Sequence, residues 1–221
     1  GKVRQAIYEG GFHDDCAMFY TSGTTGNPKG VMHTYRSPAE IFELEERNST
    51  LGMKQLSEYR FFSFLPLNHV GERIGVEMNC LLNGGSISFA ESIDTFHANL
   101  VSVQPTFFFA VPRIWMKFRS GVYEKAGQKT IDTLMSLPII GSLVRRSIRK
   151  ALGLGKASIT LTGAAITPDE VKQWYRKLGI ELREVYGMTE ACGPVTLTPY
   201  GDQSHKSEEH TSELQSLAYL V

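Results

Sequence analysis

Short apolar runs alternate along this chain with longer stretches in which apolar residues recur at helical spacing. The short runs predict buried strands over residues 16–20, 61–67, 86–90, 106–111, 158–162 and 181–186. Helical patterns follow over residues 71–82, from a cap at Asp94 to about Val103, and after Pro112 and Thr167. Strands separated by helices indicate βαβ units, so we expect an α/β domain with mostly parallel sheets flanked by helices.

Two of the predicted helices carry signals at their ends. Pro112 suits the first helical position, where the missing amide costs no hydrogen bond. Thr167, Pro168 and Glu170 predict an N-cap, a first-turn proline and the acid of a capping box. Gly179 suits the position just after the end of the same helix.

Residues 134–154 allow two interpretations. Their apolar positions are Ile140, Leu143, Val144, Ile148 and Leu152, and their polar partners are Arg145, Arg146, Arg149 and Lys150. The pattern favours a helix laid on the core with a solvated basic side. The alternative is a peripheral contact with a membrane surface, which would suit a lipid substrate.

Composition narrows the classes of protein. Hydrophobic residues make up 42% of the 221 residues, as in ordinary globular proteins. A balance of 23 basic and 23 acidic residues argues against a nucleic-acid partner. Cys16, Cys80 and Cys192 are odd in number and form no CxxC pair, so neither a disulfide framework nor a zinc site is expected. We expect a reducing, intracellular location, either cytoplasmic or peripheral on a membrane.

Residues 20–30 read Tyr-Thr-Ser-Gly-Thr-Thr-Gly-Asn-Pro-Lys-Gly. Glycines let backbone N–H groups approach an anion closely, hydroxyls add donors, and Lys29 adds a positive charge. This combination predicts a polyphosphate-binding loop, although a polar surface loop would have a similar composition. It is not a Walker A loop, because only two residues separate Gly23 from Gly26.

A second motif, Tyr-Gly-Met-Thr-Glu, spans residues 186–190 at the end of a predicted strand. Tyr186 offers a flat face for a purine, Gly187 permits a sharp turn, and Glu190 offers a carboxylate fit for Mg²⁺. The plainer interpretation is a strand end with a core tyrosine and a solvated glutamate. The small residues Gly163, Ala164 and Ala165 lie earlier and suit either a ligand against the backbone or tight helix–sheet packing.

Together these motifs resemble the signatures of the adenylate-forming superfamily, which includes acyl-CoA synthetases, peptide-synthetase adenylation domains and beetle luciferases. The resemblance covers about residues 14–202. It implies phosphate contacts from Thr21, Ser22, Gly23, Thr24, Thr25, Gly26 and Lys29. It implies an adenine and acyl pocket lined by Gly163, Ala164 and Ala165, nucleotide contacts from Tyr186, Gly187, Met188 and Thr189, and Mg²⁺ binding by Glu190. Thr21, Lys29, Thr189 and Glu190 would be the catalytic residues.

Two further segments resemble long-chain acyl-CoA synthetases in particular. Residues 65–73 read Leu-Pro-Leu-Asn-His-Val-Gly-Glu-Arg, and His69 becomes a candidate for the carboxylate end of the substrate pocket or a satisfied structural residue. Residues 111–117 read Val-Pro-Arg-Ile-Trp-Met-Lys, where Met116 replaces the usual glutamate and Trp115 suits packing. A departure follows the phosphate loop, where residues 33–36 read His-Thr-Tyr-Arg instead of Thr-His and a small polar residue.

The resemblance implies an ATP- and Mg²⁺-dependent ligase that joins a fatty acid to AMP and then passes the acyl group to CoA. Two alternatives stay open: an aryl or amino-acid adenylating enzyme, and a non-catalytic nucleotide-binding fragment. Residues 1–204 would be the central part of the AMP-binding domain, truncated at both ends. The family's ribose-binding Asp, hinge and mobile C-terminal domain do not follow Tyr200, so the fragment alone is expected to be inactive.

The last residues break the family pattern. Residues 206–216 resemble the in-frame translation of a common sequencing adapter. We therefore expect residues 205–221 to be a non-native, disordered tail. A native polar linker is the alternative, because such a composition often stays disordered.

Overall fold

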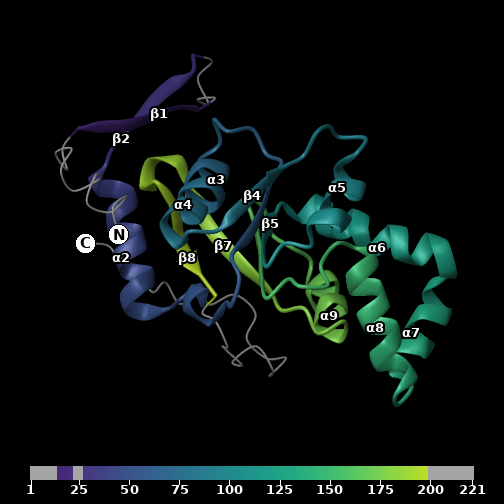
Figure 1. Ribbon diagram of the computed structural model, residues 1–221. Coiled ribbons are helices and arrows are strands. Elements are labelled where there is room, and N and C mark those ends of the chain that lie inside the picture. Colours follow the sequence, from purple (N-terminus) through teal and green to yellow (C-terminus); the bar gives the residue numbers. More distant parts are fainter. Residues whose placement is uncertain (1–13, 22–26, 199–221) are drawn as a thin grey trace.

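The computed structural model describes residues 14–21 and 27–198, and their strands form two sheets (Figure 1). The larger sheet has the order β4-β3-β5-β6-β7-β8, and the smaller one pairs β1 with β2. Strands β4, β3, β5, β6 and β7 are parallel, whereas β8 runs antiparallel to β7. The predicted α/β fold with a mostly parallel sheet and flanking helices is confirmed.

The strands of the larger sheet agree with the apolar runs in the sequence. They are β3 (Arg60–Ser63), β4 (Ser86–Phe89), β5 (Phe107–Ala110), β6 (Ile159–Gly163), β7 (Leu182–Met188) and β8 (Gly193–Leu197). Only β3 ends well before its predicted limit, because the apolar run continues into the turn around Pro66. Strand β8 was not predicted.

Most helices between the strands follow the pattern, although the helix over Arg36–Asn48 was not predicted. The helices are α2 (Arg36–Asn48), α3 (Val70–Glu72), η2 (Arg73–Met78), α4 (Asn79–Asn83), α5 (Phe96–Val103), α6 (Pro112–Ala126), α7 (Gln128–Ser136), α8 (Ile140–Ala151) and α9 (Asp169–Lys177). Single turns of 3-10 helix form η1 (Met53–Gln55) and η3 (Thr189–Ala191). Pro112 opens α6 as predicted, and Gly179 takes a left-handed φ of 75° after α9. The helical run predicted over residues 71–82 is continuous, with the π-helix η2 in its middle.

The capping box predicted for α9 is wrong. The Thr167 hydroxyl lies 2.8 Å from the Thr162 hydroxyl, and the Thr167 amide donates to the Glu184 carboxylate at 3.1 Å. Glu170 pairs instead with Arg119, so the side chains that would have capped the helix are committed to neighbouring elements. The N-cap falls one residue after Thr167 and forms no side-chain cap.

The helix start predicted at Asp94 is wrong by one residue. The N-cap of α5 is Thr95, whose backbone amide donates to the Ser92 hydroxyl at 3.1 Å. The local turn between these residues satisfies the Thr95 amide, and the helix begins after it.

The strand predicted over residues 16–20 exists but is neither buried nor part of the parallel sheet. Strand β1 (Asp15–Thr21) pairs antiparallel with β2 (Lys29–Thr34) in a hairpin. Met18 and Tyr20 are 52% and 66% exposed, whereas Phe19 is buried. The buried ring anchors the hairpin on a small cluster formed by Val70, Ile74 and Cys192.

The main core lies on the sheet face covered by α5, α6, α8 and α9. Phe108, Trp115 and Tyr175 are fully buried there, and each ring stabilises the fold by roughly 1.5–3 kcal/mol. The Trp115 indole donates to the Ala110 carbonyl at 3.1 Å, and the Tyr175 hydroxyl donates to the Trp115 carbonyl at 2.9 Å. Trp115 is thus a packing residue, as expected.

Residues 134–154 form two antiparallel helices, α7 and α8, rather than one. The break lies at residues 137–139, where Pro138 disfavours helical backbone before it. Ile148 and Leu152 are buried in the core, while Ile140 and Leu143 are 50% and 64% exposed. Only part of the predicted apolar stripe therefore covers the core.

The remaining expectations concern the cysteines, a membrane contact and the C-terminal tail. Cys16, Cys80 and Cys192 are all free thiols. In the part of the chain that the structure describes, no helix is long and apolar enough to cross a membrane. The tail over residues 205–221 lies outside the described residues and stays a prediction.

Candidate active site

The loops that follow β6 and β7 meet at one edge of the sheet. These neighbouring strands are parallel, so Gly163 and Met188 end them on the same side. In open α/β sheets, ligands bind outside the carboxyl ends of the strands. The predicted Gly-Ala-Ala turn and the second motif are thus brought together.

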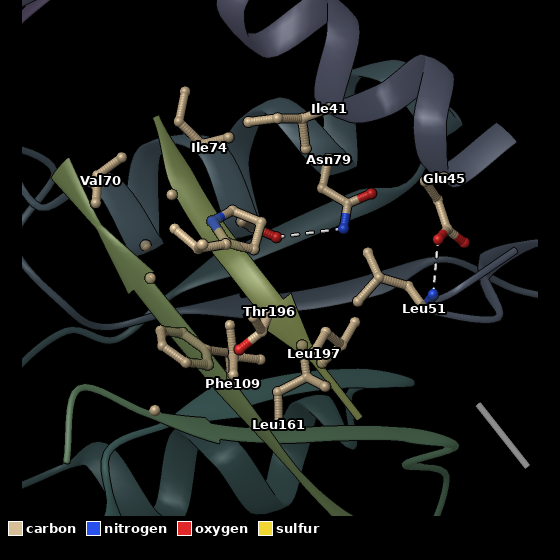
Figure 2. Close-up of a pocket in the computed structure, with 18 of the residues that line it drawn as sticks. Ile41, Glu45, Leu51, Val70, Ile74, Asn79, Phe109, Leu161, Thr196 and Leu197 are labelled. Carbon is tan, nitrogen blue, oxygen red and sulfur yellow. Dashed lines mark hydrogen bonds between the residues drawn. The ribbon is translucent and has the colours of Figure 1, made fainter. Parts of the chain in front are cut away.

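A cavity of about 530 Å³ opens at this edge and runs along β8. Figure 2 shows Ile41 and Ile74 on helices at one side of it, and Phe109 and Leu161 on strands at the other. Other apolar side chains complete the wall: Phe42, Leu44, Leu51, Val70, Phe107, Val185, Val195 and Leu197. All of β8 lines the cavity, which therefore extends about 13 Å at roughly 3.3 Å per residue.

Residues predicted for the site line the cavity at the edge of the sheet. They are His69, Gly163, Ala164, Gly187, Met188 and Thr189. A Cβ atom on Gly163 would lie 2.8 Å from the Val185 carbonyl oxygen, so this position requires glycine. Ala164 has a φ of 67°, which turns the chain sharply after β6. Ala165 is exposed and does not line the cavity.

Gly187 is needed for a different reason from the one predicted. It lies within β7, and a Cβ there would meet the Gly193 carbonyl oxygen at 2.4 Å. The glycine permits close approach of β8 beside an irregular step in the strand pairing, rather than a sharp turn.

His69 begins the helix that lines the cavity. Its Nδ1 accepts from the Gly71 amide at 3.1 Å, so the imidazole is the side-chain N-cap of α3. Since Nδ1 is an acceptor, the proton of the neutral ring lies on Nε2, which is left as a donor. The structural and the substrate-facing interpretations of His69 are compatible, because they use different nitrogens.

Glu72 is a buried acid close to the site that was not predicted from the sequence as a site residue. Its side chain is fully buried in the same segment as His69, and burial raises the pKa of its carboxyl. The Ser63 hydroxyl and the backbone of Leu65 and Phe64 partly oppose this rise in pKa. The carboxyl therefore lies against the loop that connects β3 to His69.

The far end of the cavity is closed by residues 49–53. The Glu45 carboxylate accepts from the backbone amide of Leu51 at 2.6 Å (Figure 2). It also accepts from the backbone amide of Met53 at 3.2 Å. Arg183, which is only 2% exposed, donates to the carbonyls of Thr50 and Leu51 at 2.9 and 2.7 Å. Two charged side chains thus fix the floor of a mostly apolar cavity.

Thr21 and Lys29 flank the predicted phosphate loop. They face each other across the β1–β2 hairpin, and the Thr21 hydroxyl donates to the Lys29 carbonyl at 3.5 Å. The intervening candidates Ser22, Gly23, Thr24, Thr25 and Gly26 lie outside the described residues. The strand predicted before these residues is β1, which belongs to the hairpin rather than to the parallel sheet.

His33 joins the two motifs and was missed as a site residue. It is 5% exposed, and its Nε2 lies 2.6 Å from the Thr189 carbonyl oxygen. A carbonyl only accepts, so Nε2–H donates. The available signal was the unusual histidine after the phosphate loop, but the sequence did not identify its partner.

Tyr186 and Glu190 lie beside the cavity rather than in its wall. Tyr186 is 56% exposed on β7, so it is not the core tyrosine of the plainer interpretation. Glu190 is exposed on η3, next to Thr189. Residues 14–21 and 27–198 contain no group of three or more His, Cys, Asp or Glu side chains that could hold a metal ion. A Mg²⁺ ion here would take its remaining ligands from phosphates and water, as is usual for this metal.

Two solved structures that resemble this chain bear on its identity. The solved adenylation domain of a carboxylic acid reductase from Segniliparus rugosus, in complex with AMP and a co-purified carboxylic acid, matches with a TM-score of 0.64 and 27% identity. The match covers 85% of this chain and 29% of that one. ATP-bound MatB from Rhodopseudomonas palustris, at 22% identity and a TM-score of 0.58, shares the fold.

Curated relatives are similar in sequence. Long-chain-fatty-acid–CoA ligase ACSBG1 of Bos taurus is 28% identical over 87% of this chain. ACSBG2 of Gallus gallus is 30% identical over 83% of it. The aligned regions span 30% and 28% of these relatives, respectively. Residues 10–213 match the AMP-binding enzyme family, and the chain therefore belongs to that family, as its two motifs indicated.

Proposed function

We propose that this chain is the nucleotide- and acyl-binding part of a long-chain fatty acid–CoA ligase. The observation that carries the proposal is the apolar cavity, which begins at the second motif and ends on a fixed floor 13 Å away, at roughly 3.3 Å per residue of β8. A cavity of this size and lining suits a ligand that is mostly hydrocarbon with one polar end.

The charges of the cavity favour a fatty acid over an amino acid. Glu45 is the one charged side chain among its described lining residues, and both of its oxygens accept from backbone amides. A substrate ammonium group would therefore have to compete with these two amides for the only carboxylate among the described lining residues. An unpaired ammonium group in such a cavity would be strongly disfavoured.

The proposed reaction begins with attack by a carboxylate oxygen on the α-phosphorus of ATP. The new P–O bond forms as the bond to the β-phosphate breaks, and its electron pair leaves with pyrophosphate. The thiol of CoA then attacks the acyl carbon, releasing AMP and a proton. Because the chemistry is mainly a redistribution of charge, the protein acts through positioning and electrostatic stabilisation.

Each site residue has a role that follows from its position. Thr21 and Lys29 would hold phosphate oxygens at the base of the loop. His69 would donate from Nε2 to the substrate carboxylate at the mouth of the cavity. Tyr186, exposed beside the motif, would stack on adenine. Glu190, with phosphate oxygens, would hold Mg²⁺, which neutralises phosphate charge when bound.

The test is ATP–pyrophosphate exchange by the complete enzyme that contains this chain. We expect exchange with fatty acids and little with benzoate-type acids or amino acids. Equal or better exchange with an aryl acid would favour the other class of carboxylate-activating enzyme. ATP binding without exchange for any acid would support a non-catalytic nucleotide-binding role.

A further inference from the structure

An apolar tip projects from the end of the molecule opposite the β1–β2 hairpin. It is the turn between α7 and α8, which Figure 1 shows far from the strands β7 and β8 that line the cavity. Its large side chains are exposed: Leu137 by 38%, Ile139 by 81%, Ile140 by 50% and Leu143 by 64%. We call these four residues the apolar tip.

The tip is held in place by the rest of the hairpin. Gly141 is buried so closely that a Cβ atom there would lie 2.5 Å from the Met135 carbonyl oxygen. The Arg145 guanidinium donates to the same carbonyl at 2.7 Å. Met135 and Ile148 are buried in the main core, so the hairpin presents its apolar tip in a fixed shape.

Basic residues strongly outnumber acidic residues in the segment around the tip. Residues 125–168 contain seven lysines and arginines but a single acid, Asp132, in a chain whose formal net charge is zero. Asp132 accepts from the Tyr123 hydroxyl at 3.3 Å. Lys129, Arg146 and Lys150 are exposed.

The apolar and basic residues are arranged in sequence along one exposed strip of α8. Leu143, Arg146 and Lys150 are all exposed and follow one another at helical spacing. At a rise of about 1.5 Å per residue, the two basic groups lie roughly 4 and 10 Å from Leu143 along the axis. Amphipathic elements bury their apolar residues about 5–10 Å into the boundary between headgroups and acyl chains.

We propose that the apolar tip and its basic flank dock this protein on an anionic lipid surface. The four apolar side chains would enter the boundary region, while Arg146, Lys150 and Lys129 would meet the negative headgroups. The tip protrudes rather than forming a groove, which fits a lipid surface better than a partner helix. The proposal is independent of the proposed reaction, because docking requires neither ATP nor an acid.

The experiment is co-sedimentation of the full chain with vesicles. One set contains only phosphatidylcholine, and the other contains about 30% phosphatidylserine. We expect binding to the anionic vesicles that weakens in high salt and is largely absent with the neutral ones. Failure to bind anionic vesicles, or equal binding to both sets, would overturn the proposal.

Paired variants separate the two components of docking. Ile139→Ser with Leu143→Ser should weaken binding by roughly tenfold or more, because these residues are proposed to leave water. Arg146→Gln with Lys150→Gln should weaken it about twenty-five-fold, at roughly fivefold for each neutralised charge. These side chains are exposed, so the thermal midpoint should not change.

Matched control variants replace residues of the same types at exposed positions away from the tip. Ile93 and Leu81 are 93% and 66% exposed, and Ile93→Ser with Leu81→Ser should leave binding intact. Arg176 and Lys177 are exposed on α9, and their glutamine variants should do the same. If either control pair lowers binding as much as its partner pair, the assigned surface is wrong.

Discussion

The Nε2–H of His33 donates to the backbone carbonyl of Thr189 at 2.6 Å, across 156 residues of sequence. His33 lies four residues after Lys29 on β2, and Thr189 opens η3 in the second motif. This part-buried bond therefore ties the β1–β2 hairpin to the turn that carries Glu190. Edge-on packing against the Phe19 ring, with centroids 5.9 Å apart, further fixes the imidazole.

We expect His33→Leu to separate the two motifs. The substitution leaves a carbonyl without its donor in a part-buried site, which typically costs about 1–3 kcal/mol. The free energy of unfolding of the chain should fall by that amount in urea titrations. In the complete enzyme, the KM for ATP should rise, because the two motifs that we propose to bind the nucleotide would lose their alignment.

His97→Leu is the matched control. The His97 Nε2 lies 3.0 Å from the Ala151 carbonyl, which is the same kind of bond at an exposed site away from the cavity. It should reduce stability by less and leave the KM for ATP unchanged. Equal effects of the two variants on that KM would mean that His33 does not couple the motifs.

In the proposed acyl cavity, we expect one position, Gly75, to limit the length of the bound acyl chain. Gly75 lies in the π-helix η2 and lines the cavity, and a Cβ atom there would have nothing within 4 Å. Gly75→Leu should fill the open space and reduce exchange with long fatty acids while sparing short ones. Exchange rates over a series of chain lengths would measure the shift.

Gly121→Leu controls for the effect of leucine on a helix. Gly121 lies in α6 and is likewise open, but it does not line the cavity. Both variants replace a helical glycine, which should stabilise the helix by up to about 1 kcal/mol. A change in chain-length preference with Gly121→Leu, or none with Gly75→Leu, would count against the proposed acyl site.

Local pattern was sufficient for the parallel sheet but not for the hairpin. The runs over β5 and β6 are apolar because both faces of those strands are covered, so periodicity identified them. Strand β1 has a similar composition, yet its Met18 and Tyr20 are exposed and its partner is β2. Which strand pairs with which is decided by contacts distant in sequence.

The same distinction applies to the site. Gly163 and Thr189 were predicted as site residues from residue type and spacing, and both line the cavity. Glu45 and Arg183, which fix the cavity floor, resemble ordinary surface charges in the sequence. Their roles depend on backbone groups of residues 49–53, whose position no local pattern encodes.

The buried thiol of Cys192 predicts loss of stability at high pH. Burial raises the pKa of Cys192 from 9.0 to about 12. In the unfolded chain the thiol ionises near pH 9, whereas in the folded chain it stays protonated until about 12. Unfolding therefore releases protons in this window, so the free energy of unfolding should fall as pH rises from 9 to 12.

Replacing the thiol should reduce this slope. Urea titrations across the same pH window should show a smaller loss of stability for Cys192→Ala than for the unaltered chain. The half-buried Cys16 has a pKa that is also raised, mainly by burial, and Cys16→Ala provides the comparison. An unchanged slope for Cys192→Ala would mean that the thiol ionises equally in both states.

The last prediction separates the roles of Glu190 and Tyr186 in the complete enzyme. Glu190 is proposed to hold Mg²⁺ where charge redistributes as pyrophosphate leaves, and it lies outside the cavity wall. Glu190→Ala should therefore cut the exchange rate a few hundredfold, or about 3–4 kcal/mol, while fatty-acid binding is largely retained.

Tyr186→Ala should chiefly raise the KM for ATP, because stacking is similar in the ground and transition states. The 56% exposed ring contributes less to the fold than a core tyrosine would, so the variant should remain folded. Exchange rates, the KM for ATP and the Kd for a fatty acid, measured for both variants, distinguish the two roles. Near-normal exchange by Glu190→Ala would leave that glutamate as a solvated residue at a strand end, and the metal would have to be held elsewhere.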